Sequence, residues 1–189
     1  MTSNSEIPWF LPVLDDADSE AVRRTVMSGF VNEGPENRAF ERELTAYFNV
    51  PYAVTMPSCT ISIALALKAL GIGHGDTVLV PALTFIGTAG AVRLTGAEPI
   101  LVDVDPVSFN MDPSDAGRRI KSNTRGIVPV HLNGRPAPLP ALREIARQNH
   151  LDIVEDTAEG LGSKSREGWL GTISESGCFS HAPTKLITS

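Results

Sequence analysis

The alternation of strand-like and helix-like segments is the feature that most constrains the fold of this chain. Short runs rich in Val and Ile predict strands at 52–56, 76–81, 98–105, 125–131 and 151–156. The segments between them have helical spacing or are apolar nearly all round, and they predict helices at 60–73, 84–96, 112–122 and 138–150. Buried strands separated by helices are typical of a mostly parallel sheet that is covered on both faces. The sequence therefore predicts an α/β protein with three α/β/α layers.

The first 50 residues have a different pattern and predict a helical segment. In the stretch 16–30, Val22 and Val26 lie four residues apart and Gly29 provides a C-terminal stop. A second helix is expected from Pro35, which suits the first position of a helix.

Charge and composition exclude several classes of function. The net charge is −6 and the pI is near 5.2, so no basic excess is present to neutralise a nucleic acid. No apolar run is long enough to span a membrane, and the first residues lack the pattern of a signal peptide. Cys59 and Cys178 lie far apart, which argues against a zinc site and a disulfide framework. A cytoplasmic protein that acts on small molecules is expected, with no metal, nucleic-acid or membrane partner.

In parallel sheets, ligands collect beyond the carboxyl ends of the strands, so the residues that follow each strand are the candidates for a site. Ser58, Cys59 and Thr60 open the helix after the first strand run. The unpaired N–H groups and positive dipole of a helix start can hold a phosphate, whereas the more common role of Ser or Thr there is to cap the helix. The sequence leaves both roles open.

Three further residues follow strands in the same way. Phe85 comes after 76–81, where its ring could stack on a planar ligand or pack in the core. Glu155 and Asp156 end the strand at 151–156. Buried carboxylates are costly unless they meet donors or a cation, so one of them is expected to face a cation supplied by a ligand. The alternative is that one acid caps a helix and its neighbour is solvated.

The last segment, "GCFSHAPTK", contains a hydroxyl at Ser180 and an amine at Lys185. A lysine in a dry site loses its proton readily and attacks carbonyl groups, whereas a lysine near a chain end is more often a solvated charge. A phosphate-holding helix start, a stacking aromatic ring, an acid and an imine-forming lysine together are typical of a pyridoxal 5′-phosphate (PLP) site.

The motifs also resemble a known family. The segments "SGFVNEGPENRAFERELTAYF", "PSCTISIALALKALGIGHGDTVLVPALTF", "VEDTAEGLGS" and "GCFSHAPTK" are similar to successive signatures of the DegT/DnrJ/EryC1/StrS family of PLP-dependent sugar aminotransferases, a branch of fold type I. The blocks "GAEPILVDVDPVSFNMD" and "GIVPVHLNGRPAPLPAL" resemble the two blocks between them. The resemblance covers nearly the whole chain. It implies that residues 51–189 form part of the large PLP-binding domain, and that the small C-terminal domain is absent.

The resemblance assigns a role to each candidate. Lys185 would be the Schiff-base lysine and proton carrier, Asp156 would pair with the pyridine nitrogen, and Phe85 would stack on the ring. Cys59 and Thr60 would hold the phosphate with help from Ser180. Glu159 would lie near the phenolic oxygen of the ring. The implied substrates are a nucleotide-linked keto sugar and an amino donor such as glutamate, and the implied assembly is a homodimer.

The chain departs from the family pattern at three positions and in its length. Cys59 stands where Gly is usual, His181 where Phe is common and Leu186 where Asn is frequent. Family members continue beyond the lysine into more of the large domain and a small domain.

Two alternatives therefore stay open. One is a non-catalytic remnant that binds only a cofactor or partner. The other is a sugar dehydratase of the same family, and Lys185 argues against it because those enzymes carry His at this position. A nucleotide-binding α/β domain is disfavoured because no glycine-rich nucleotide motif is present.

Overall fold

The structure is a computed structural model that describes residue 8 and residues 10–187 of the chain. Its described residues form two compact units: unit 1 comprises those up to Thr55 together with 181–187, and unit 2 comprises Met56–Ser180. The helices of unit 1 are α1 (Asp16–Ser28) and α2 (Pro35–Phe48). The elements of unit 2 are α3 (Cys59–Ala69), β1 (Thr77–Pro81), α4 (Ile86–Thr95), β2 (Glu98–Val102), α5 (Pro113–Arg119), β3 (Thr124–Ile127), the 3-10 helix η1 (Leu132–Gly134), α6 (Leu139–Asn149), β4 (Asp152–Asp156) and β5 (Ser176–Cys178).

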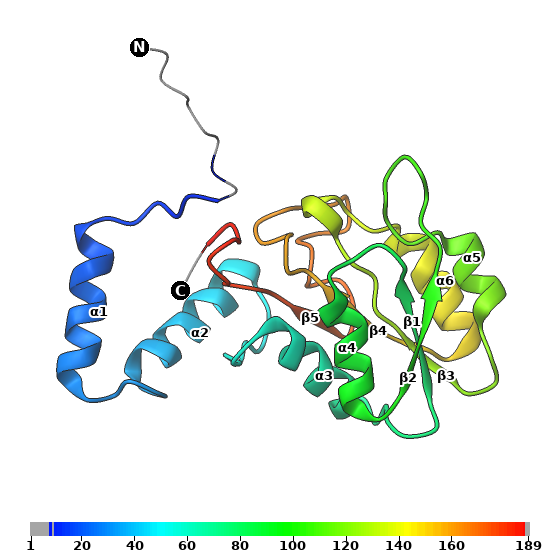
Figure 1. Ribbon diagram of the computed structural model, residues 1–189, viewed down its shortest axis with the longest axis horizontal. Coiled ribbons are helices and arrows are strands. Elements are labelled where there is room, and N and C mark those ends of the chain that lie inside the picture. Colours follow the sequence, from blue (N-terminus) through cyan, green and yellow to red (C-terminus); the bar gives the residue numbers. More distant parts are fainter. Residues whose placement is uncertain (1–7, 9, 188–189) are drawn as a thin grey trace, which may run out of the picture. The chain divides into compact units, whose positions relative to one another are not determined.

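Within the described residues, unit 2 contains one parallel sheet with the strand order β2-β1-β3-β4-β5. Helices cover both faces of this sheet (Figure 1). This arrangement confirms the predicted three-layer α/β/α class. Because all the strands run in one direction, their carboxyl ends meet at one edge of the sheet.

Strand alternation divides the core of unit 2 into two clusters. Val78 and Val80 of β1 pack with α3 and α4 on one face of the sheet, whereas Leu79 packs with α5 and α6 on the other. β4 alternates in the same way, with Val154 on the α3 and α4 face and Ile153 on the opposite face. These side chains are at most 2% exposed. Burial on both faces explains why consecutive residues such as Val78, Leu79 and Val80 are all apolar.

Unit 1 follows the helix signals of the sequence. Asp15 caps α1 through a capping box with Asp18, and α1 ends at Gly29, whose φ of 79° suits a residue without a side chain. In this unit, the ring of Phe40 meets the ring of His181 edge to face, with centroids 5.1 Å apart. His181 therefore occupies an aromatic environment, as the Phe common at this position in the family would.

Two expectations about secondary structure were wrong or only partly right. The segment 52–56 is not a strand: Tyr52 and Val54 are 85% and 68% exposed, and Thr55 donates its N–H to Glu41 rather than to a neighbouring strand. Alternation alone does not make a strand when no partner strand supplies hydrogen bonds. The helix that follows it is buried along one side, because Ile63 and Leu67 face the core while Leu65 is 46% exposed.

A search of the described residues for helices that are long and apolar enough to cross a membrane found none. The same residues contain no cluster of three or more His, Cys, Asp or Glu side chains that could hold a metal ion.

Candidate active site

Several predicted site residues of unit 2 lie at the carboxyl edge of the sheet. Phe85 follows β1, Asp156 is the last residue of β4, and Ser180 follows β5. Because β4 and β5 are neighbours in the sheet and β1 lies two strands from β4, the fold gathers these residues at one edge although they are up to 95 positions apart in the sequence.

The carboxylate of Asp156 is only 5% exposed and points toward the face covered by α3 and α4. Its Oδ2 accepts a hydrogen bond from the hydroxyl of Thr88 at 2.8 Å, and its Oδ1 accepts one from the N–H of Ala158 at 3.1 Å. The Sγ of Cys59 lies 4.0 Å from Oδ1. Burial raises the pKa of the Cys178 thiol to about 12, and the negative charge of Asp156 contributes in the same direction.

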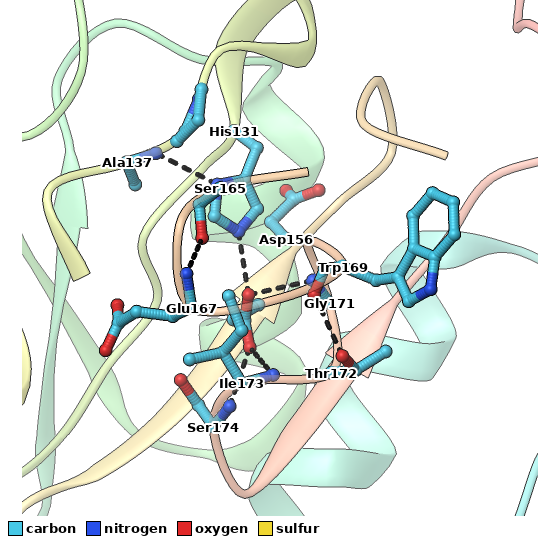
Figure 2. Close-up of polar contacts among 12 residues, drawn as sticks. His131, Ala137, Asp156, Ser165, Glu167, Trp169, Gly171, Thr172, Ile173 and Ser174 are labelled. Atoms are coloured by element: carbon cyan, nitrogen blue, oxygen red, sulfur yellow. Dashed lines mark hydrogen bonds and ion pairs between the residues drawn. The ribbon is translucent and has the colours of Figure 1, made fainter. Parts of the chain in front are cut away.

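Glu155, the residue before Asp156, points to the opposite face of the sheet and is completely buried. Its Oε2 lies 2.8 Å from Nε2 of His131 and accepts the N–H of Gly171, while its Oε1 accepts the N–H groups of Ile173 and Ser174 (Figure 2). The alternative of a helix cap beside a solvated acid was therefore wrong, because both acids are buried. Glu155 meets protein donors that hold the segment 171–174 against β4.

The protonation of His131 follows from its neighbours. Its Nδ1 accepts the N–H of Ala137 at 3.0 Å, so the proton of the neutral ring lies on Nε2 and is donated to Glu155. Burial by itself raises the pKa of Glu155, but the hydrogen bonds from His131 and from the N–H groups of Gly171 and Ile173 outweigh it and hold that pKa below its ordinary value. His131 was not singled out from the sequence. The available signal was that His131 ends one predicted strand segment and that Glu155 lies near the end of the next predicted strand segment.

Phe85 occupies a position that local energetics do not favour. It is the N-cap of α4 and makes no capping hydrogen bond with its side chain, and its ring is 74% exposed. Ser, Thr, Asp and Asn are preferred at an N-cap, and an apolar residue there costs about 1 kcal/mol. A large exposed ring at a poorly suited position is expected where a ligand uses it.

Gly87 lets this ring lie close to the start of α3. A Cβ added at Gly87 would lie 2.6 Å from a ring atom of Phe85 and 2.6 Å from Oγ1 of Thr60. The ring and the Thr60 hydroxyl therefore both lie against Gly87, at a place that any larger residue would fill. A flat ligand with a phosphate at one end fits such a pair, with the ring on Phe85 and the phosphate at the helix start.

Ser58 caps α3, which is one of the two roles that the sequence left open, the other being to hold a phosphate. Its hydroxyl oxygen accepts the N–H of Ile61 at 3.3 Å, and its carbonyl accepts the N–H of Ser62. This cap directs the first N–H groups of the helix, those of Cys59 and Thr60, toward the end where helices hold anions. The hydroxyl of Ser58 is thus engaged in shaping the helix start.

Two other predicted residues have defined surroundings. Glu159 is exposed, and its carboxylate accepts the N–H of Asn133 at 2.8 Å. Lys185 belongs to unit 1, is half-buried, and donates its backbone N–H to the carbonyl of Ala182 at 2.8 Å, which closes a turn. The pairing of the Lys185 amine with the Asp156 site stays a prediction from the sequence, as does the division of the chain at residue 50.

The parallel sheet, with helices on both faces and a buried acid at the end of β4, has the fold of about half of a solved putative sugar aminotransferase. Residues 12–189 match the model of the DegT/DnrJ/EryC1/StrS aminotransferase family. The chain belongs to this family, which confirms the resemblance seen in the motifs.

Named relatives give the same result. The chain is 43% identical over 178 residues to the erythromycin biosynthesis sensory transduction protein EryC1 of Saccharopolyspora erythraea, covering 94% of this chain and 48% of that protein. It is 36% identical over 184 residues to the GDP-perosamine synthase of Escherichia coli O157:H7, covering 97% of this chain and 50% of the synthase. The structure matches the PLP-form of Spr1654 from Streptococcus pneumoniae with a TM-score of 0.92 at 29% identity, covering 96% of this chain and 50% of that one. The chain spans about half the length of the curated relatives it matches.

Proposed function

We propose that the chain is the cofactor-binding part of a PLP-dependent aminotransferase that moves an amino group from an amino acid, such as glutamate, to a keto sugar carried on a nucleotide. The observation that carries this proposal is the buried carboxylate of Asp156, at the same sheet edge as the exposed ring of Phe85. Membership of the family supports the reaction, and the GDP-perosamine synthase among the relatives supports a sugar substrate.

The described residues fit the cofactor. When bound, PLP supplies a positively charged ring that accepts the electrons released when a proton leaves the carbon next to the amino group. Asp156 is already held by hydrogen bonds in a site that excludes water, so it can pair with the ring nitrogen without a large reorganisation. Phe85 supports the ring from one side.

The start of α3 holds the phosphate in this proposal. Thr60 contributes its N–H and hydroxyl, Cys59 its N–H, and Ser180 a further hydroxyl. The side chain of Cys59 lies near Oδ1 of Asp156, so it occupies the gap between the helix start and the carboxylate. The glycine usual in the family would leave that gap empty. Glu159 would interact with the phenolic oxygen of the ring.

Lys185 would hold PLP through its amine. Once the amino donor has freed this amine, it would act as the base and acid that moves the proton released at the donor carbon. The amino donor leaves as a 2-oxo acid, and the keto sugar leaves as an amino sugar, so the two half-reactions balance. A homodimer in the full-length enzyme and a cytoplasmic location are further parts of the proposal.

A spectrum of the purified chain with added PLP tests the assignment. We expect an absorption band of the imine that borohydride reduction removes, and peptide mapping should locate the reduced adduct at Lys185. The same measurement on the full-length protein, followed by addition of glutamate, tests transfer of the amino group. A chain that folds but forms no adduct at Lys185 would contradict the proposed function.

A further inference from the structure

Thr88, in the first turn of α4, directs its hydroxyl away from its own helix. Thr25, Thr45 and Thr95, which also lie in helices, donate their hydroxyl hydrogens to backbone carbonyls one turn back. A carbonyl of the same helix is the usual partner of a helical threonine. Thr88 instead donates to Oδ2 of Asp156 at 2.8 Å, and the two side chains are almost completely buried. Its hydroxyl therefore serves the carboxylate and not the helix.

The hydroxyl of Thr84 continues this chain of hydrogen bonds. Oγ1 of Thr84 lies 3.0 Å from Oγ1 of Thr88. A hydroxyl has one hydrogen, and Thr88 uses its hydrogen on Asp156, so Thr84 must be the donor to Thr88. The order is thus from Thr84 to Thr88 to Asp156. In a buried environment each bond of such a chain polarises the next and strengthens it.

The other groups near the carboxylate of Asp156 complete its surroundings. Oδ1 accepts the N–H of Ala158, and the Sγ of Cys59 lies 4.0 Å from the same oxygen. On the β5 side, Cys178 is buried and interacts with the charge of Asp156. Each carboxylate oxygen therefore has a donor of its own, which fixes the plane of the group. Hydrogen bonds donated to the charged form of an acid favour that form over the protonated one.

We propose that Thr84 and Thr88 form a positioning pair that keeps Asp156 ionised and oriented, so that the proton shared with the ring nitrogen of PLP stays on the nitrogen. The inference rests on the proposed function and deepens it. Without the hydroxyl of Thr88, the carboxylate becomes the stronger base and draws the shared proton toward itself. The ring then loses positive charge and accepts electrons less well.

The test compares four proteins reconstituted with PLP labelled with 15N in the ring: the wild type, Thr88→Val, Thr88→Ser and Thr84→Val. Valine has the shape of threonine without the hydroxyl, and serine keeps the hydroxyl. We expect the ring 15N signal to move toward the value of the unprotonated ring in Thr88→Val, to move less in Thr84→Val, and to return to the wild-type position in Thr88→Ser. In the full-length enzyme, kcat of Thr88→Val should fall about tenfold or more, with a smaller change in KM.

A second measurement does not need the cofactor. In the chain without PLP, the 13C signal of the side-chain carboxyl carbon of Asp156 should report protonation of the carboxylate at a higher pH in Thr88→Val than in the wild type. An identical ring 15N signal in the wild type and Thr88→Val would overturn the inference while leaving the proposed function intact. Failure of the wild type to bind PLP at all would instead remove the proposed function and this inference with it. If Thr88→Val does not fold, Thr84→Val decides the matter by the same signal.

Discussion

Replacing Glu155 by glutamine tests how much this buried acid stabilises the fold. Glutamine has nearly the same shape but presents one acceptor oxygen and one amide that can only donate. Glu155 faces donors on both of its oxygens: His131 and Gly171 at Oε2, and Ile173 and Ser174 at Oε1. Either orientation of the new amide must therefore turn a donor toward other donors.

The magnitude follows from counting these donors in each orientation. An amide nitrogen at the Oε1 position leaves the N–H groups of Ile173 and Ser174 without an acceptor. An amide nitrogen at the Oε2 position leaves the N–H of Gly171 without one, and His131 can accept from the amide only by giving up its bond from Ala137. At about 1–3 kcal/mol for each buried donor left unpaired, Glu155→Gln should lower the free energy of unfolding by about 2–6 kcal/mol. That is a large part of the about 5–15 kcal/mol that a typical domain has.

Urea unfolding at pH 7, followed by circular dichroism, measures this loss. Glu144→Gln is the matched control, because Glu144 pairs with Arg147 on the surface and both side chains are more than half exposed. The control should unfold with the wild type, since exposed ion pairs contribute little. The reasoning is refuted if Glu155→Gln also unfolds at the wild-type urea concentration.

The same pair of proteins has a predicted pH dependence. The pKa of Glu155 in the folded chain lies below the ordinary value of 4.5. Its stabilisation is therefore complete above about pH 4.5 and is lost as the pH falls from there through the lowered pKa of the folded state. The difference in unfolding free energy between the wild type and Glu155→Gln should be constant near neutral pH and shrink in that acidic range.

Further predictions concern the site itself. Gly87→Ala places a Cβ against the ring of Phe85 and should weaken PLP binding about threefold to tenfold, whereas Gly90→Ala, in the same helix with nothing within 4 Å of its Cβ, should leave PLP binding unchanged. Equal fluorescence titrations for the two variants would contradict the role given to Phe85. Lys185→Ala should abolish both the imine absorption band and amino transfer in the full-length enzyme, and undiminished turnover would refute its role. Asp156→Asn should bind PLP weakly and be nearly inactive, and wild-type affinity and rate would count against the ion pair with the ring. Because the pKa of Cys178 is raised to about 12, a thiol reagent at pH 8 should modify half-buried Cys59 in the folded chain and Cys178 only after unfolding, and equal rates would contradict this.

The sequence predicted β1 to β4, whose apolar runs carry a local signal, but β5 (Ser176–Cys178) was not among the predicted strands. The strand 77–81 is buried on both faces, so Val78, Leu79 and Val80 are all apolar, and helix ends such as Gly29 and Gly96 are marked by residues that suit a left-handed backbone. The segment 52–56 has a comparable alternation but no partner strand. Pairing is a tertiary property that no local pattern reveals.

For the candidate site, the sequence indicated which residues matter but not which partner each one has. Glu155 and Asp156 looked alike as neighbouring acids, and only their opposite directions from β4 separate them. The donors of Glu155 lie 16 to 24 positions away in the chain, and Thr88 lies 68 positions from Asp156. Long-range contacts of this kind depend on the fold and not on spacing.

The alternation of β4 also limits how the gene for this protein can change in length. Deleting one residue between Asp152 and Val154 would turn the carboxylate of Asp156 toward segment 171–174 and that of Glu155 toward α4. Each acid would then face the donors that belong to the other, and the apolar neighbours would be inverted with them. Insertions and deletions in this strand are therefore tolerable only in pairs, and a designer who grafts new loops onto this scaffold must count its residues in twos.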